Sequence, residues 1–259
     1  MLFSALSFFL WIPAILGIGS LGHIPYHVWI NKKRNETIVE NAILGMALIS
    51  ASANWLNLFF AIGKFIQLTI LLIGWSRFLY IWYKKEDKKP SKTLLWGGIL
   101  LGLGLPFLRA HIAPSYHDSG LYGLQSVLWY NATAIPLGLA NLHGRLAYNS
   151  AWLALASVLQ FPTGDFFFSG ELLLWFMSFM MLFSIEASMK GEWSPVVVYG
   201  LFVSLVFLTP VLGTFILSSI ATDYPVFWLT IASGWISLRL FEYKIQPTYA
   251  IWFTTILFL

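Results

Sequence analysis

Residues 41–83 read NAILGMALISASANWLNLFFAIGKFIQLTILLIGWSRFLYIWY, an apolar run whose only charged side chains are Lys64 and Arg77. At about 1.5 Å per residue, this run is long enough for two helices that each cross a hydrocarbon core of ~30 Å. We therefore expect a helical hairpin, with one helix from Asn41 to Phe60 and a second from Ala61 to Tyr83.

The rest of the chain has the same apolar character. Of its 259 residues, 58% are hydrophobic and 10% are charged, whereas roughly 25% of the residues of a soluble domain are charged. A chain inside lipid must bond its own backbone groups, as a helix or a closed barrel does, and these runs are too long and too unalternating for barrel strands. The predicted fold class is all-α, a polytopic transmembrane helical bundle of about eight membrane helices.

The predicted bundle forms a single transmembrane domain, residues 1–259, in three parts. Four helices occupy residues 1–109, an outer-face loop with amphipathic interfacial helices occupies residues 110–170, and four further helices occupy residues 171–259. Besides the hairpin, the expected runs are Leu2–Ile30, Thr93–Arg109, Glu171–Ser188, Ser194–Ser218, Tyr224–Leu240 and Thr248–Leu259. Because the last run ends without a polar segment, we expect the chain to be an N-terminal fragment of a longer protein.

The basic residues predict the topology. Lys32, Lys33 and Arg34 follow the first run, and five lysines lie between positions 84 and 92. Short loops rich in Lys and Arg stay in the cytoplasm, so residues 110–170 and 218–225 are expected on the opposite, extracytoplasmic face. The same placement of cations between apolar runs argues against a nucleic-acid partner, although the net charge is +4. The absence of cysteine excludes disulfides and thiolate metal sites.

Polar motifs interrupt the predicted outer face. The segment YHDSGLYGLQ at 116–125 contains Asp118, Tyr122 and Gln125, and the segment NLHGRLAYNS at 141–150 contains His143 and Arg145. A second acid of this face, Asp223, lies in the segment SSIATDYP at 218–225.

The Asp118-x-x-x-Tyr122 pattern, followed by a later outer-face acid at Asp223, resembles the acidic motifs of the GT-C glycosyltransferase superfamily. The stretch 141–152 is similar to a bacterial multipass GT-C-like family, and the resemblance extends roughly from the second helix to Asp223. It implies a multipass protein of a bacterial plasma membrane that transfers a sugar from a polyprenyl-phosphate donor. The implied partners are this donor lipid, a glycan or lipid acceptor of the cell envelope, and membrane lipids.

The resemblance also implies which residue acts as base. Moving a sugar from a polyprenyl phosphate to a hydroxyl requires a base for the hydroxyl proton and cations for the departing phosphate. Asp118 is the implied catalytic base, with Tyr122 and Gln125 as substrate-binding residues of the same segment. Asp118 is equally suited to cap a helix that begins at Ser-Gly-Leu-Tyr, so both roles stay open.

Three other residues are assigned to substrate binding. The planar fork of Arg145 matches phosphate oxygens, with His143 beside it, although contact with lipid headgroups is a simpler interpretation. Asp223 suits the acceptor, a sugar hydroxyl or a divalent metal ion, the one candidate cofactor, but Thr-Asp-Tyr-Pro also resembles a helix start. For Arg109 we favour a role at the helix end over phosphate binding.

Two alternative functions use the same residues. In a transporter, the outer acids and Arg145 would line a substrate pathway, and a glycan polymerase or ligase would share the lipid-linked substrates. The scarcity of charge in the middle of the apolar runs, together with the lack of an inverted repeat, argues against a transporter. The sequence therefore favours a transferase.

Overall fold

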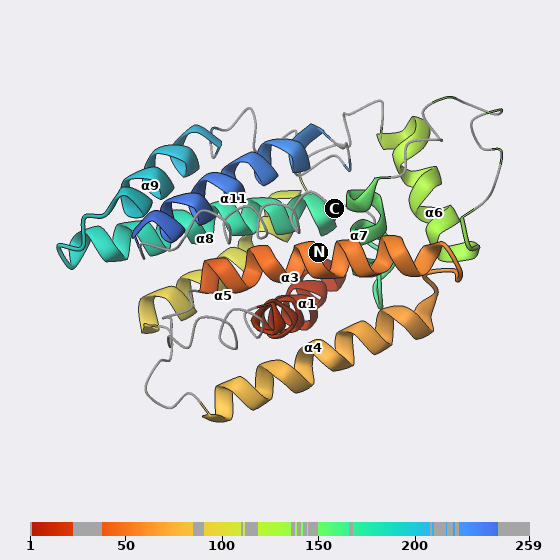
Figure 1. Ribbon diagram of the computed structural model, residues 1–259, viewed down its shortest axis with the longest axis horizontal. Coiled ribbons are helices and arrows are strands. Elements are labelled where there is room, and N and C mark those ends of the chain that lie inside the picture. Colours follow the sequence, from red (N-terminus) through yellow and green to blue (C-terminus); the bar gives the residue numbers. More distant parts are fainter. Residues whose placement is uncertain are drawn as a thin grey trace.

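The computed structural model describes residues 2–22, 38–84, 91–109, 111, 119–135, 138, 141, 144, 150–165, 168–207, 209, 216, 220 and 223–242. These residues form a bundle of helices (Figure 1) and include no strand. The predicted all-α class is confirmed. The expected run Thr248–Leu259 lies outside the described residues.

Each of the other seven expected runs has a helical counterpart. The elements are, in order, α1 (Leu2–Leu21), α3 (Ile38–Asn57), α4 (Lys64–Lys84), α5 (Lys92–Arg109), a π-helical turn η2 (Ser119–Gly123), α6 (Leu124–Ala132), α7 (Ala151–Leu159), α8 (Phe168–Met189), α9 (Pro195–Phe207) and α11 (Asp223–Glu242). Within the described ranges, α4 and α8 are long and apolar enough to cross a membrane. The apolar parts of α1 and α9 are shorter, so the number of spans stays a prediction.

Small residues let α1 pack closely against both helices of the predicted hairpin. A Cβ atom on Gly45 of α3 would overlap the carbonyl group of Ile15, and a Cβ atom on Gly74 of α4 would lie 2.5 Å from the carbonyl oxygen of Ala14. Close backbone approach at small residues is typical of helix pairs in membranes. The hairpin is therefore held together through α1, which lies between α3 and α4.

Helices α5 and α8 pair in antiparallel fashion. The Ser91 hydroxyl, just before α5, donates to Glu186 near the end of α8, and the Trp175 indole N–H donates to the Gly98 carbonyl at 3.0 Å. This register brings the last residue of α5, Arg109, beside Glu171 in the first turn of α8.

The helix pairings define two ends of the bundle, which we name after the two ends of α11. At the Glu242 end, Arg239 bonds to Glu40 of α3 at 2.9 Å, and the amide N–H of Val196 in α9 donates to Glu242 at 3.3 Å. At the Asp223 end lie α6, α7 and the start of α8. In Figure 1, α6 and α7 are at the right and the turn between α8 and α9 is at the left.

The predicted outer-face loop contains η2, α6 and α7, but α7 differs from the interfacial helix that we expected. Every side chain from Trp152 to Leu159 is buried, and the helix packs among α3, α6 and α8. Its sequence, AWLALASVL, is apolar on all sides, and such a helix is stable only inside the protein or in lipid.

Candidate functional site

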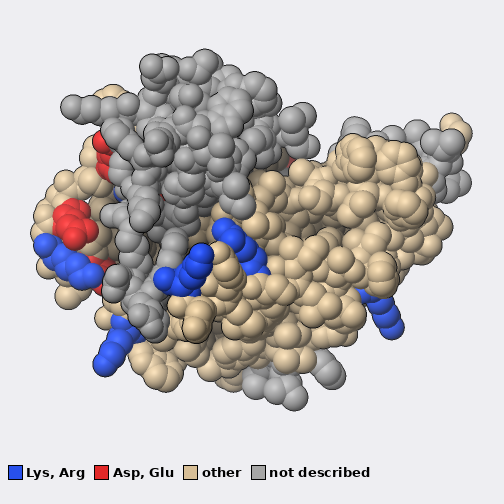
Figure 2. Space-filling view, turned by 60° about the horizontal axis from the view of Figure 1, so that its bottom comes forward, with Lys and Arg blue, Asp and Glu red and all other residues tan. Residues whose placement is uncertain are grey.

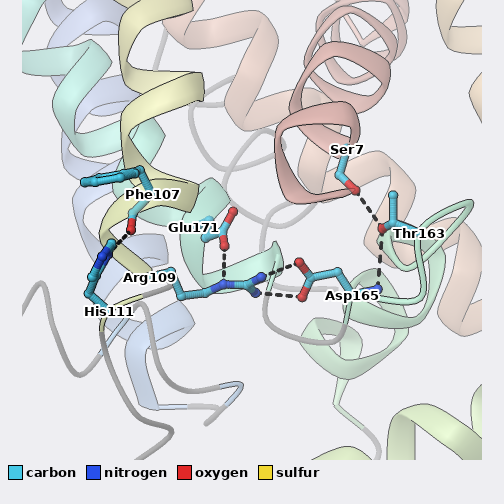
Figure 3. Close-up of polar contacts among 7 residues, drawn as sticks. All are labelled: Ser7, Phe107, Arg109, His111, Thr163, Asp165 and Glu171. Atoms are coloured by element: carbon cyan, nitrogen blue, oxygen red, sulfur yellow. Dashed lines mark hydrogen bonds and ion pairs between the residues drawn. The ribbon is translucent and has the colours of Figure 1, made fainter. Parts of the chain in front are cut away.

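A cluster of buried charges lies where α5 ends and α8 begins (Figure 3). The Nη1 and Nη2 atoms of Arg109 each donate to one carboxylate oxygen of Asp165 at 2.6 Å. The Nε atom of Arg109 lies 2.5 Å from Glu171 Oε1. The Glu171 side chain is fully buried, and those of Arg109 and Asp165 are 18% and 11% exposed. Paired, mostly buried charges of this kind fix the relative position of the elements that carry them.

The segment that carries Asp165 is bound to α1. Thr163 Oγ1 lies 2.8 Å from the Ser7 hydroxyl and accepts a hydrogen bond from the Asp165 amide at 3.4 Å. The Trp11 indole N–H donates to the Phe161 carbonyl at 2.7 Å. Helices α1, α5 and α8 thus meet at the turn 160–165. The contacts of this turn with α1 fix the position of the Asp165 carboxylate that binds Arg109.

This cluster changes the interpretation of Arg109. Arg109 is the last residue of α5, at the helix end where we expect it. Carboxylates bind both edges of its guanidinium group, so its charge pairs with two acids and not with a phosphate. The position of Arg109 on the predicted outer face, against the topology rule, indicates a specific role for this cation. Its pairing with Asp165 and Glu171, which follow along the chain, was not predicted.

A second contact joins the two segments that contain the predicted acids. The Ser119 hydroxyl is buried and accepts a hydrogen bond from the Ile220 amide at 3.1 Å. Ser119 begins η2 and directly follows Asp118, whereas Ile220 lies three residues before Asp223. Segments about a hundred positions apart in sequence therefore lie together at the Asp223 end.

The described candidates occupy this end of the bundle. Tyr122 is half-buried in η2, Gln125 is exposed in the first turn of α6, and Asp223 is exposed as the first residue of α11. Asp118, His143 and Arg145 lie outside the described residues. Among the described residues, no group of three or more His, Asp or Glu side chains is arranged to hold a metal ion.

Neutral amides fasten α6 and α7 to the hairpin. Gln67 Nε2 lies 2.9 to 3.0 Å from three acceptors, which are the carbonyl oxygens of Ile62 and Ser157 and the Oδ1 atom of Asn131. The Ser157 hydroxyl donates to the same Asn131 oxygen at 2.6 Å, and Asn131 Nδ2 donates to Gln160. This network fixes α6, which follows η2, against the start of α4.

Tyr130 adds a titratable group to the same interface. Its hydroxyl donates to Asn54 Oδ1 at 3.3 Å and lies 3.5 Å from the Ser150 carbonyl oxygen. Burial disfavours the phenolate and raises the pKa of Tyr130 to about 12. The neutral phenol is therefore the form that packs between α6 and α3.

A small hollow of about 80 Å³ lies between α3, α7 and α11, next to the start of α11. Its lining includes Ser50, Trp152, Pro225 and Trp228. Pockets that enclose a complete small-molecule ligand have volumes of roughly 300–1,000 Å³, so this hollow can take only a small group.

Comparison with known protein families assigns the chain to one family. The model of one protein family matches residues 1–259, the whole chain. The chain belongs to the family described as Domain of unknown function (DUF8201). No curated protein and no solved structure matches it.

Proposed function

We propose that this DUF8201 protein is a multipass membrane protein, with α4 as one of its spans. The lysines that begin and end α4 are 20 residues apart, about 30 Å along a helix axis, which is the thickness of a hydrocarbon core. Between them, large apolar side chains are exposed, among them Phe65 at 83% and Leu72 at 57%. Lysines at such positions extend to the headgroups while apolar side chains contact the acyl chains.

The surface as a whole supports this proposal. Exposed large apolar residues also occur on α5 and α9, including Trp96, Leu100, Phe202 and Leu205. Figure 2, turned so that the bottom of Figure 1 comes forward, shows a described face with few charged side chains. Large apolar side chains exposed along several helices are unusual on soluble monomers, where such surfaces mark contact with a membrane or a partner.

Within this membrane protein we propose a GT-C-like sugar transfer at the Asp223 end, on the extracytoplasmic face. The observation that carries the proposal is the hydrogen bond between Ser119 and Ile220. It supports a common site for the segment that follows Asp118 and the segment that leads to Asp223, the two acidic segments that the resemblance requires. The bonded Ser119 and Ile220 are buried, while Tyr122, Gln125 and Asp223 keep exposed surface.

The proposed chemistry is a displacement at the anomeric carbon of the donor sugar. Asp118 takes the proton of an acceptor hydroxyl, the acceptor oxygen bonds to the anomeric carbon, and the bond from that carbon to the phosphate oxygen breaks. The polyprenyl phosphate leaves with both electrons of that bond, and Arg145 and His143 stabilise its charge. Tyr122, Gln125 and Asp223 bind the sugar or the acceptor.

A transporter is the second candidate, and the buried charges are the observation that favours it. Glu40 and Glu171 are almost fully enclosed and each pairs with an arginine. Glu40, however, lies in the first turn of α3 and Glu171 in the first turn of α8, not in the middle of a helix. Charges at helix ends lie at the edge of a bilayer, where they stabilise structure without forming a pathway, so we keep sugar transfer first.

The test is sugar transfer in membranes that contain the protein as it occurs in its host. A panel of synthetic polyprenyl-phosphate hexoses and pentoses is offered with labelled sugar, and incorporation into membrane glycans and lipids is measured. Asp118→Asn is expected to reduce turnover by ~10² to 10⁴ because it removes the base and keeps the shape. Glu192→Gln, an exposed acid at the far end, is the control. Wild-type turnover in Asp118→Asn contradicts the assignment, and labelled sugar that crosses vesicles without transfer favours a transporter.

A further inference from the structure

A large groove lies between α3 and α4. It has a volume of about 650 Å³ and is lined almost entirely by apolar side chains, and this volume lies within the range of ligand sites. Leu48 and Ile49 of α3 form one wall, Ile66, Ile70 and Ile73 of α4 form the other, and Leu21 at the end of α1 closes one side.

One face of α4 continues this groove into a cationic site. Ile66, Ile70, Ile73, Arg77, Tyr80 and Lys84 are spaced four, three, four, three and four residues apart, so they lie along a single stripe of the helix. Three isoleucines line the groove. The two cations and the tyrosine follow on the same stripe just beyond this lining, and we call their end of the groove the mouth. The stripe changes from apolar to basic within one helical turn.

The cations at the mouth are held in fixed positions. Arg77 Nε donates to the Ser20 hydroxyl at 3.0 Å, and the Arg77 guanidinium lies 5.2 Å from the centre of the Tyr80 ring. Lys84 Nζ lies 5.0 Å from the same ring. Tyr80 is thus flanked by two positive charges, and its exposed ring keeps both close to the mouth.

Arg77 and Lys84 differ from the arginines Arg109 and Arg239 in their acidic partners. Arg109 and Arg239 are each neutralised by two acids, whereas Arg77 and Lys84 contact no Asp or Glu among the residues that the structure describes. Seven residues of helix, about 10 Å, separate Arg77 from Lys84. If α4 spans the bilayer between its two lysines, Lys84 lies at the headgroup level and Arg77 lies about one and a half to two turns below it. The long side chain of Arg77 extends from there towards the headgroups, where anionic phosphates neutralise basic residues.

We propose that the groove binds one acyl chain of an anionic phospholipid, whose phosphate is held by Arg77 and Lys84. The inference rests on the proposed membrane location of α4, but it does not depend on sugar transfer. The cationic mouth lies beside the end of α1 and the end of α4, whereas the described candidates Tyr122, Gln125 and Asp223 lie at the Asp223 end, where α4 begins. The bound lipid is therefore a second lipid, distinct from the sugar donor.

The test measures lipid binding by the whole protein in neutral detergent. Fluorescent phosphatidylglycerol is titrated and compared with phosphatidylcholine of the same chains. Wild type is expected to bind one phosphatidylglycerol, at least about fivefold more tightly than phosphatidylcholine, as one or more phosphate–cation contacts predict. Arg77→Gln is expected to remove most of this preference, and Arg77→Lys is expected to keep it. Ile70→Trp, which fills the groove, should weaken both lipids.

Two controls separate lipid binding from folding. Lys64→Gln changes a cation at the opposite end of the same helix and should leave both affinities unchanged. Because Arg77 also stabilises the end of α1 through Ser20, its variants are checked by thermal unfolding. Substitution of the exposed Lys84 by Gln provides a second variant that does not disturb this contact, and its affinity for phosphatidylglycerol should also fall about fivefold.

Equal binding of the two lipids by wild type, or unchanged binding by Lys84→Gln together with Ile70→Trp, overturns the proposal. Displacement of phosphatidylglycerol by a polyprenyl phosphate at equal concentration also overturns it, because the groove would then hold the donor. Failure of Asp118→Asn to reduce sugar transfer leaves this binding test unaffected.

Discussion

Helices α4 and α8 have nearly the same length and are both apolar enough to cross a membrane, yet they are buried in opposite ways. Every residue of α8 from Phe168 to Met180 is buried. The buried residues of α4 are Gln67, Leu71 and Gly74, while many of its large apolar side chains are exposed. Hydropathy therefore does not determine which apolar helix forms the centre of the bundle. Helix α4 contacts the protein mainly through three buried residues, two of them polar or small, whereas the first half of α8 is buried on all sides.

Their polar anchors differ as well. Gln67 fastens α4 through uncharged amides and carbonyls, whereas Glu171 fastens α8 through an ion pair with Arg109. A neutral anchor and a charged anchor respond differently to substitution and to pH, which makes the comparison testable.

The largest expected effect is at the charged anchor of α8. Arg109→Met leaves Asp165 and Glu171 buried together without their cation, and breaking a buried pair in this way costs about 3–5 kcal/mol. Lys64→Met on α4 removes an exposed cation with no acidic partner among the described residues and should change stability little. Thermal and denaturant unfolding in detergent measure both variants. Equal stability of the two would mean that the ion pair does not hold α8.

The exposed face of α4 provides the next test, because it reports which solvent surrounds this helix. In lipid, Leu72→Asp places a carboxylate near the middle of α4 and should raise the apparent insertion free energy by about 3 kcal/mol. In water the same change at an exposed position would alter stability by roughly 0.5 kcal/mol or less. Met189→Asp, at the exposed end of α8, is the control. Insertion is measured as the carbonate-resistant fraction, and wild-type insertion of Leu72→Asp would remove α4 from the membrane.

Near the uncharged anchor of α4, Tyr130 is expected to make the stability of the protein depend on pH in the alkaline range. Tyr130 packs beside the amide network, and its pKa is raised from 10.0 to about 12. A raised folded-state pKa means that its contribution is complete below pH 10 and is lost as the pH rises towards 12, by up to about 2.7 kcal/mol. Unfolding of wild type and Tyr130→Phe is compared at pH 9 and pH 11.5. The wild type should lose more stability, and parallel losses would show that Tyr130 ionises as freely as in the unfolded chain.

The smallest effect is expected at Gly74, a buried residue of α4 where this helix crosses α1. Gly74→Ala places a methyl group 2.5 Å from the Ala14 carbonyl oxygen, and such overpacking costs typically about 1–3 kcal/mol. Gly104→Ala in α5 meets nothing within 4 Å and should be neutral or slightly stabilising, since alanine favours helix. The difference in melting temperature between the two variants measures the closeness of α1 and α4. No difference would place this crossing further apart.

The sequence was sufficient to predict the all-α class and the hairpin of α3 and α4, because apolar runs interrupted by polar residues set helix length. It did not distinguish α7 or α8 from α4, since burial depends on which apolar faces meet each other and not on local composition. The Arg109 cluster was missed for the same reason: its three members are brought together by the packing of α1, α5 and α8. Of the predicted site, Tyr122, Gln125 and Asp223 lie at one end of the bundle. The roles assigned to Asp118, His143 and Arg145 stay predictions.

The amide network has a consequence for how the protein is made. Two of the three partners of Gln67 lie 64 and 90 residues further along the chain, so α4 leaves the ribosome well before they exist. At about 5–20 residues per second, Ser157 is synthesised roughly 5 to 18 seconds later. If α4 enters the membrane in that interval, the Gln67 amide has the Ile62 carbonyl as a partner, and lipid offers it no other. We therefore expect the nascent hairpin to be completed only when α6 and α7 supply Asn131 and Ser157.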